Sequence, residues 1–67
     1  MMKYSIYDTQ TNRHALNLLE NTLVEAVRPW FKGINDANVT AAIDALANPE
    51  MRGEAAQYLG ITLVPCA

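Results

Sequence analysis

The sequence predicts a mostly α-helical fold, a compact three-helix domain whose short N- and C-terminal extended segments can pair as a two-stranded sheet. Three observations predict it. An apolar stripe at helical spacing runs through residues 16–31, and two further stripes each follow residues typical of a helix start. β-Branched and aromatic residues gather near both ends. A chain of 67 residues supports one core, so residues 1–67 are expected to form a single domain.

The segment KYSIY, residues 3–7, alternates its side chains as a short strand does, with Tyr4 and Ile6 on one side. DTQTN, residues 8–12, follows with five consecutive turn-forming residues. The strand is therefore expected to end at this turn.

The first helix is predicted to follow the turn, with Thr11 or Asn12 as its N-cap. Its apolar face consists of Leu16, Leu19, Leu23, Ala26, Val27 and Trp30, with Val24 and Phe31 at the edge. Leu18 falls on the opposite, polar side and is expected to be exposed. Pro29 lacks the N–H of a helix interior, which predicts a kink or a stop and then a short turn closed by Gly33.

Two further helices are predicted over residues 35–47 and 48–59. Asn35 can cap the first of them, because its side chain can accept a hydrogen bond from an unpaired backbone N–H. Asn48 can cap the second, with Pro49 at the first helical position. The apolar face of the last helix would consist of Met51, Ala55, Tyr58 and Leu59.

Gly60 suits a left-handed C-terminal cap for the last helix. Residues 61–64, ITLV, then suit a second strand, and Pro65 is expected to end it. Pairing of this strand with residues 3–7 would tie both ends of the domain together.

Composition narrows the classes of function. A net charge of −2 provides no general attraction for nucleic acid. Cys66 is the only cysteine and His14 the only histidine, so neither an internal disulfide nor a zinc site is expected. No apolar run approaches the ~20 residues that span a bilayer, and no membrane partner is expected. The unpaired cysteine and the lack of a secretory signal predict a reducing, cytoplasmic setting.

Enzymatic activity is not expected. His14 suits a solvated side chain in a first helical turn, and Cys66 has no base near it in the sequence. The sequence contains no Gly-rich phosphate-binding loop, no metal-ligand cluster and no catalytic triad. We therefore expect no catalytic residues, no cofactor and no metal.

The segment RPWFKG, residues 28–33, is the strongest candidate for a binding surface. Its aromatic residues Trp30 and Phe31 are flanked by the cations Arg28 and Lys32, a combination that can meet an acidic partner, a membrane interface or stacked bases. Alternatively, the rings anchor the core and the cations favour the negative end of a helix. The full set of candidate partner-binding residues is Leu18, Arg28, Trp30, Phe31, Lys32 and Tyr7.

The stretch AAQYLGIT, residues 55–62, resembles the first helix and turn of DNA-binding helix-turn-helix units. The resemblance implies a second helix that reads the major groove. Only five residues follow Thr62, and they include Pro65, so no such helix is expected. Close packing of alanines and a cap at Gly60 explain the motif better.

These observations favour a small non-enzymatic protein-binding regulator, adaptor or inhibitor. It would present a helix face or an edge strand to another protein or to a second copy of itself. So small a chain also fits an origin in a phage or other mobile element. The alternative is a nucleic-acid-binding dimer that uses the truncated motif and pools Arg13, Arg28, Lys32 and Arg52.

Overall fold

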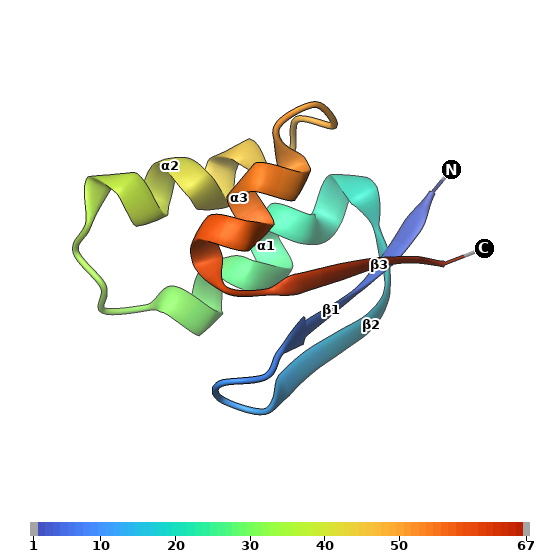
Figure 1. The fold of residues 1–67 in the computed structure, drawn as a ribbon, viewed down its shortest axis with the longest axis horizontal. Coiled ribbons are helices and arrows are strands. Elements are labelled where there is room, and N and C mark those ends of the chain that lie inside the picture. Colours follow the sequence, from blue (N-terminus) through green and yellow to red (C-terminus); the bar gives the residue numbers. More distant parts are fainter. Residues whose placement is uncertain (1, 67) are drawn as a thin grey trace.

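The computed structural model describes residues 2–66 as a three-stranded sheet beside three α-helices (Figure 1). The strands are β1 (Lys3–Asp8), β2 (Arg13–Leu19) and β3 (Thr62–Cys66). The α-helices are α1 (Leu23–Val27), α2 (Ala37–Ala45) and α3 (Arg52–Leu59), and the 3-10 helices are η1 (Glu20–Thr22) and η2 (Arg28–Phe31). The domain is mixed α and β, so the prediction of a mostly α-helical fold is wrong.

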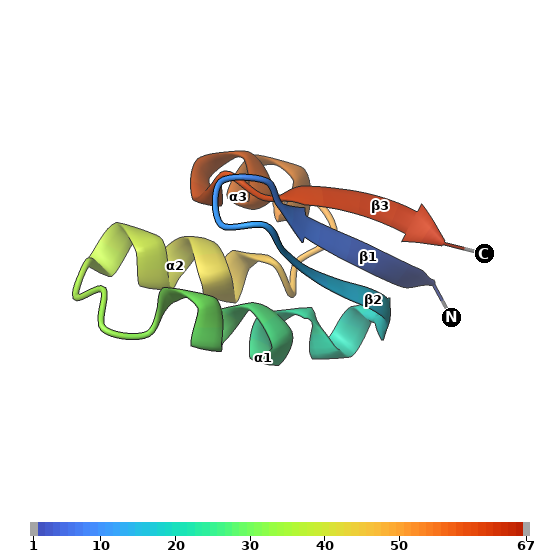
Figure 2. The ribbon, with the colours of Figure 1, turned by 90° about the horizontal axis from the view of Figure 1, so that it is seen from below.

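The sheet is antiparallel with strand order β2-β1-β3, so the N-terminal strand is central. β1 pairs with β3 from Lys3 opposite Cys66 to Tyr7 opposite Thr62, so the two terminal segments do pair, which the sequence left open. Pro65 lies inside β3 instead of ending it, because an edge strand tolerates a residue without an N–H. The helices lie on one side of the sheet (Figures 1 and 2).

The largest difference from the prediction is at residues 13–19. They form the strand β2, although the first helix was predicted to begin there. The turn over residues 8–12 closes a β-hairpin instead of leading into a helix. Asn12 adopts a left-handed conformation with φ 57°, and the Asp8 carboxylate accepts the Gln10 N–H at 3.1 Å. Neither Thr11 nor Asn12 caps a helix.

A bulge in the hairpin explains why β2 resembles a helix in the sequence. Tyr4 lies opposite Leu18 and Ile6 opposite Ala15, so two residues of β2 occupy the space opposite one residue of β1. Asn17 absorbs the extra residue with φ 57°, a conformation that asparagine tolerates better than most residues. The bulge breaks the two-residue alternation by which a strand is recognised.

The remainder of the first predicted helix is short. Leu23 begins α1, and the chain changes from α-helix to 3-10 helix at Arg28, beside Pro29. This is the predicted effect of a proline without an N–H. Gly33 ends the following turn with φ 89°, also as predicted.

The other two helices begin later than predicted. Asp36, and not Asn35, caps α2, and its carboxylate accepts the backbone N–H two residues on at 2.8 Å. Asn48 makes the same kind of bond at 2.9 Å, but it closes a turn, and α3 starts only at Arg52. Gly60 has φ 75° at the end of α3, which confirms the predicted cap.

The core lies between the inner face of the sheet and the helices. It consists of Ile6, Leu23, Val27, Ile43, Leu46, Ala55, Ala56 and Ile61. Met51 and Tyr58, predicted to face the core from α3, are 50% and 57% exposed. Instead, the residues that α3 buries are Arg52, Ala55 and Ala56.

Candidate protein-binding surface

One face of the sheet points away from the helices, and we call it the outer sheet face. Residues opposite one another in the strands share a face, so the pairing defines its positions. They are Lys3, Ser5 and Tyr7 in β1, His14 and Leu19 in β2, and Thr62, Val64 and Cys66 in β3. Leu16 lies in the bulge without a paired residue, and it is assigned to this face because it alternates with Ala15, whose partner is the buried Ile6, and because it is exposed.

Large apolar side chains are exposed on this face. The exposed fractions are 39% for Tyr7, 52% for Leu16, 38% for Leu19 and 41% for Val64. When one face of an antiparallel sheet is solvated, its side chains are normally polar. These four side chains come from all three strands of one face, and we call them the apolar patch; apolar side chains gathered on one exposed face are typical of interaction sites.

A small polar cluster fixes the middle of the outer sheet face. The Ser5 hydroxyl oxygen lies 3.1 Å from the Cys66 sulfur and accepts the Asn17 N–H at 3.4 Å. This contact links β3, β1 and the bulge of β2, so the three strands hold the patch as one surface.

The rim of the face has no carboxylate among its positions. Tyr7 and His14 stack with ring centroids 6.4 Å apart at one end, and Lys3 lies at the other. Asp8, the acid nearest in the strand, is only 6% exposed and pairs with Arg13 at 3.3 Å.

The environment of Asp8 shifts its acidity. Burial raises the pKa of this carboxyl group, but hydrogen bonds from the Thr11 side chain, from the Gln10 and Thr11 backbone and from the Arg13 side chain outweigh burial. The net result is a pKa below the usual value of 3.8. The charged carboxylate therefore stabilises the hairpin turn.

A groove lies between η2 and α2, with a volume of about 610 Å³. Its lining is Glu25, Arg28, Pro29, Phe31, Lys32, Ile34, Val39, Thr40 and Ile43. Three predicted partner-binding residues, Arg28, Phe31 and Lys32, thus lie around one groove. Arg28 also pairs with Asp44 at 2.8 Å, with both side chains mostly exposed.

The remaining predicted residues lie elsewhere. Tyr7 is on the outer sheet face, away from the groove. Trp30 packs against the core, and the Arg13 guanidinium lies over its ring, 5.3 Å from the centroid. Leu18 is half-buried against the core, opposite Tyr4, so the prediction that it is exposed is wrong. Because of the bulge, Leu18 faces the core and the next residue, Leu19, faces outward.

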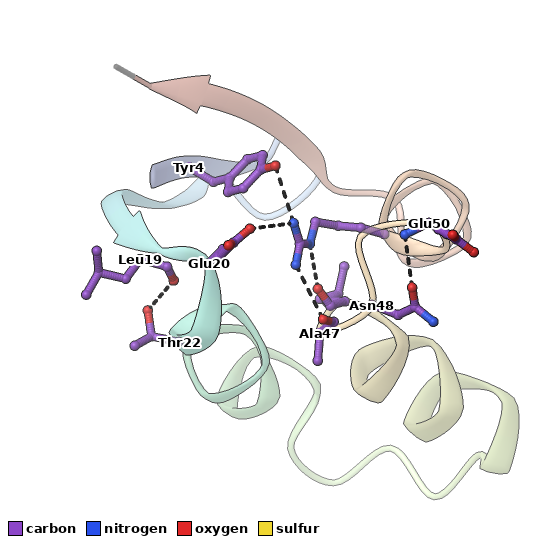
Figure 3. A network of polar contacts seen from close by, with 9 residues as sticks. Tyr4, Leu19, Glu20, Thr22, Ala47, Asn48 and Glu50 are labelled. Carbon is purple, nitrogen blue, oxygen red and sulfur yellow. Dashed lines mark hydrogen bonds and ion pairs between the residues drawn. The ribbon is translucent and has the colours of Figure 1, made fainter. Parts of the chain in front are cut away.

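Arg52 is a buried arginine that was not predicted from the sequence. Arg52 is 5% exposed, and its Nε donates to the Leu46 carbonyl at 2.6 Å. Its Nη1 lies 3.3 Å from both the Tyr4 hydroxyl and the Glu20 carboxylate, and its Nη2 lies 3.5 Å from the Ala47 carbonyl. Figure 3 shows Tyr4, Glu20 and Ala47 converging on this guanidinium. It joins the end of α2 to β1 and η1.

The arginines proposed to pool on nucleic acid are engaged within the domain. Arg13 pairs with Asp8, Arg28 with Asp44 and Arg52 with Glu20. Arg52 is also buried and cannot reach a phosphate without unfolding its surroundings. The segment AAQYLGIT forms the end of α3, its cap and the start of β3. No recognition helix follows the turn at Gly60 within the described residues, because the chain enters β3 there.

Within residues 2–66, no group of three or more histidine, cysteine or acidic side chains is placed to hold a metal ion. No helix in this part of the chain is long and apolar enough to cross a membrane. No protein-family model matches the sequence, and comparisons with curated proteins and with solved structures return no significant match.

Proposed function

We propose that this protein is a small, non-enzymatic protein-binding module, a regulator, adaptor or inhibitor of a larger partner. The outer sheet face is its principal binding surface. The single observation that carries the proposal is the exposure of Tyr7, Leu16, Leu19 and Val64 on a sheet face that no part of the described chain covers. Domains normally bury an apolar sheet face under a second layer, and here a partner would supply that layer.

The free energy gained by covering the exposed apolar side chains is large enough to contribute to partner binding. Complete burial of one leucine-sized side chain contributes about 1.5–3 kcal/mol. The four exposed side chains are already 48–62% buried, so covering the rest of each contributes roughly half of that, together about 3–6 kcal/mol, which is at the lower end of the cost of association. The strands hold them in place before binding, so little further ordering is needed.

Two related assignments belong to the same proposal. A non-enzymatic role is part of this proposal, and it agrees with the placement of His14 on the outer sheet face, where its ring stacks with that of Tyr7. A cytoplasmic setting is supported by the single free thiol of Cys66. The nucleic-acid alternative is less well supported, because the three arginines already have acidic partners.

Affinity capture from native lysate tests the proposal. Tagged wild-type protein, Leu16→Asp and the control Tyr58→Asp would be compared after nuclease treatment and a moderate-salt wash. We expect one stoichiometric protein with wild type and Tyr58→Asp, and at least tenfold less of it with Leu16→Asp. A charge in the apolar patch would be desolvated by the partner, whereas Tyr58 lies on α3, away from the patch.

Circular dichroism of each variant verifies that the fold is retained. Equal recovery of the partner by folded Leu16→Asp would remove the outer sheet face from the interface. Recovery only of nucleic-acid-associated proteins, lost on nuclease treatment, would favour the alternative function.

A further inference from the structure

We infer that the free edge of β2 accepts an extended segment of the partner, which pairs with residues 13–16 as a fourth strand of the sheet. The inference rests on the proposed protein-binding function and adds the form of the partner segment. Three observations carry it: the proline in β3, the direction of the backbone groups in β2, and the position of α1 beyond β2.

The sheet has two edge strands, β2 and β3, and they differ in how well they can accept another strand. Prolines, charged residues and bulges are devices that protect an edge from further pairing. β3 contains Pro65, which has no N–H to donate. β2 contains no proline and no acid, and its one arginine, Arg13, pairs with Asp8. The bulge of β2 lies after Leu16, so residues 13–16 remain regular.

Pro65 also reveals the direction of the backbone groups in the central strand. It lies opposite Tyr4, and because proline has no N–H, the two residues form a non-hydrogen-bonded pair. Hydrogen-bonded and non-hydrogen-bonded pairs alternate along an antiparallel ladder. The N–H and C=O groups of Tyr4 and Ile6 therefore point away from β3 and toward β2.

The same alternation identifies the free backbone groups of β2. Ala15 lies opposite Ile6, so its N–H and C=O bond to β1. The backbone groups of His14 and Leu16, on either side of Ala15, point the other way, toward the open edge. No further strand lies beside them within residues 2–66. An extended backbone offers donors and acceptors at this two-residue spacing, whereas the backbone groups of a helix are already bonded to one another.

The helical layer extends past this edge of the sheet. In Figure 2, β2 lies between β1 and α1, so α1 is placed beyond the last strand. Ala15 and Leu18 lie opposite inward-facing residues of β1, yet both are only half-buried. A fourth strand beside β2 would lie next to α1 and would cover these two side chains from the side. The edge therefore offers apolar contact in addition to backbone hydrogen bonds.

The bulge defines the length of the partner segment. Asn17 has φ 57° and interrupts the ladder, so the pairing is confined to residues 13–16. The partner residue opposite Leu16 shares the outer sheet face with it, and Leu16 is 52% exposed. The expected segment is short and extended, with apolar side chains at alternate positions and no proline where it bonds to β2.

Chemical synthesis of the 67-residue chain allows each edge to be blocked at one atom. N-methylation of Leu16 removes an N–H that points outward from β2. N-methylation of Leu63 is the matched control, because Leu63 lies opposite Ile6 and its N–H points outward from β3. Neither amide bonds to β1, so both variants should retain the circular dichroism of the wild type. If a methyl group unfolds either variant, an ester at the same bond removes the N–H without added bulk.

A displayed library of short linear peptides is the probe. Selection on the wild-type protein should enrich apolar residues at alternate positions. The selected peptides should bind about tenfold more weakly to the protein N-methylated at Leu16, and with unchanged affinity to the protein N-methylated at Leu63. N-methylation at successive positions of a selected peptide should prevent binding at every second position only, because alternate amides of a strand face its neighbour.

Several outcomes would overturn the inference. They are no enrichment over the protein N-methylated at Leu16, equal binding to it and to the wild type, and a selected peptide without the two-residue pattern. Sedimentation showing a wild-type dimer that N-methylation of Leu16 makes monomeric would identify a second copy as the added strand. A captured partner lost with Leu16→Asp but retained after N-methylation of Leu16 would also overturn the inference, while leaving the proposed function intact.

Discussion

The two faces of the sheet are made from alternate residues of the same strands, yet they have opposite environments. Ile6 on the inner face is completely buried against the helices, whereas Leu16 on the outer face is 52% exposed. The helices of the chain cover the first face, and nothing in residues 2–66 covers the second. The inner face therefore supplies the core of the domain, and the outer sheet face is the one proposed to bind a partner.

Polar groups also differ between the interior of the domain and the outer sheet face. Among residues 2–66, no buried side-chain nitrogen or oxygen lacks a hydrogen-bond partner. Arg52 satisfies carbonyl groups at the end of α2 while it contacts β1 and η1. On the outer sheet face, Lys3 is exposed and forms no ion pair within the described residues.

The largest expected effect contrasts the two faces directly. Ile6→Ala should lower the free energy of unfolding by about 2–5 kcal/mol, because it leaves a cavity in the centre of the core. In a domain of this size that loss is comparable to the whole stability, so the variant should be largely unfolded. Urea denaturation followed by circular dichroism measures the change.

Leu16→Ala is the matched control for Ile6→Ala. It removes a similar apolar volume from the outer sheet face and should change the free energy of unfolding by less than about 0.5 kcal/mol. Equal losses for the two variants would mean that the outer sheet face is part of a closed core.

The second expected effect compares two arginines. Arg52→Met should cost about 2–3 kcal/mol of stability, because buried carbonyl groups and Glu20 lose their donor. Arg28→Met should cost less than about 1 kcal/mol, although its ion pair with Asp44 is shorter, because that pair is exposed to water. Urea denaturation distinguishes them, and a larger loss for Arg28→Met would contradict this assignment.

Much of the fold could be predicted from local signals. The strand at residues 3–7, the effect of Pro29, the turn at Gly33 and the cap at Gly60 each depend on the backbone preference of a few residues. These features agree with the structure because their causes lie within short stretches of sequence.

The hairpin could not be predicted from hydrophobic spacing. Leu16, Leu19 and Leu23 repeat at helical intervals, but only Leu23 is buried, and it belongs to α1. The bulge at Asn17 shifts the alternation of β2, and exposed leucines on the outer sheet face hide it further. The usable signal was the five-residue turn 8–12, which separates two strand-length segments and favours a hairpin.

The candidate site was predicted only in part. Tyr7 was selected and lies on the outer sheet face, but Leu16, Leu19 and Val64 were missed. Their exposure depends on the strand order and on which face of the sheet the helices cover. Neither can be predicted from the local spacing of apolar residues in the sequence. The role of Arg52 was missed for the same reason, since its partners lie far from it in sequence.

The smallest expected effect concerns the hairpin turn between β1 and β2. This turn sets the pairing register of the two strands, and the register decides which side chains lie on each face of the sheet. Asp8→Asn should lower the free energy of unfolding at neutral pH by about 1 kcal/mol, because the charge paired with Arg13 is lost. The folded pKa of Asp8 lies below the usual 3.8, so its stabilisation is present above that pH and is lost as pH falls through the folded pKa. The wild type and Asp8→Asn should therefore converge in acid. Unfolding curves between pH 2 and 7 measure the difference, with Asp44→Asn as the exposed control. A constant difference across this range would show that the carboxylate charge does not stabilise the turn.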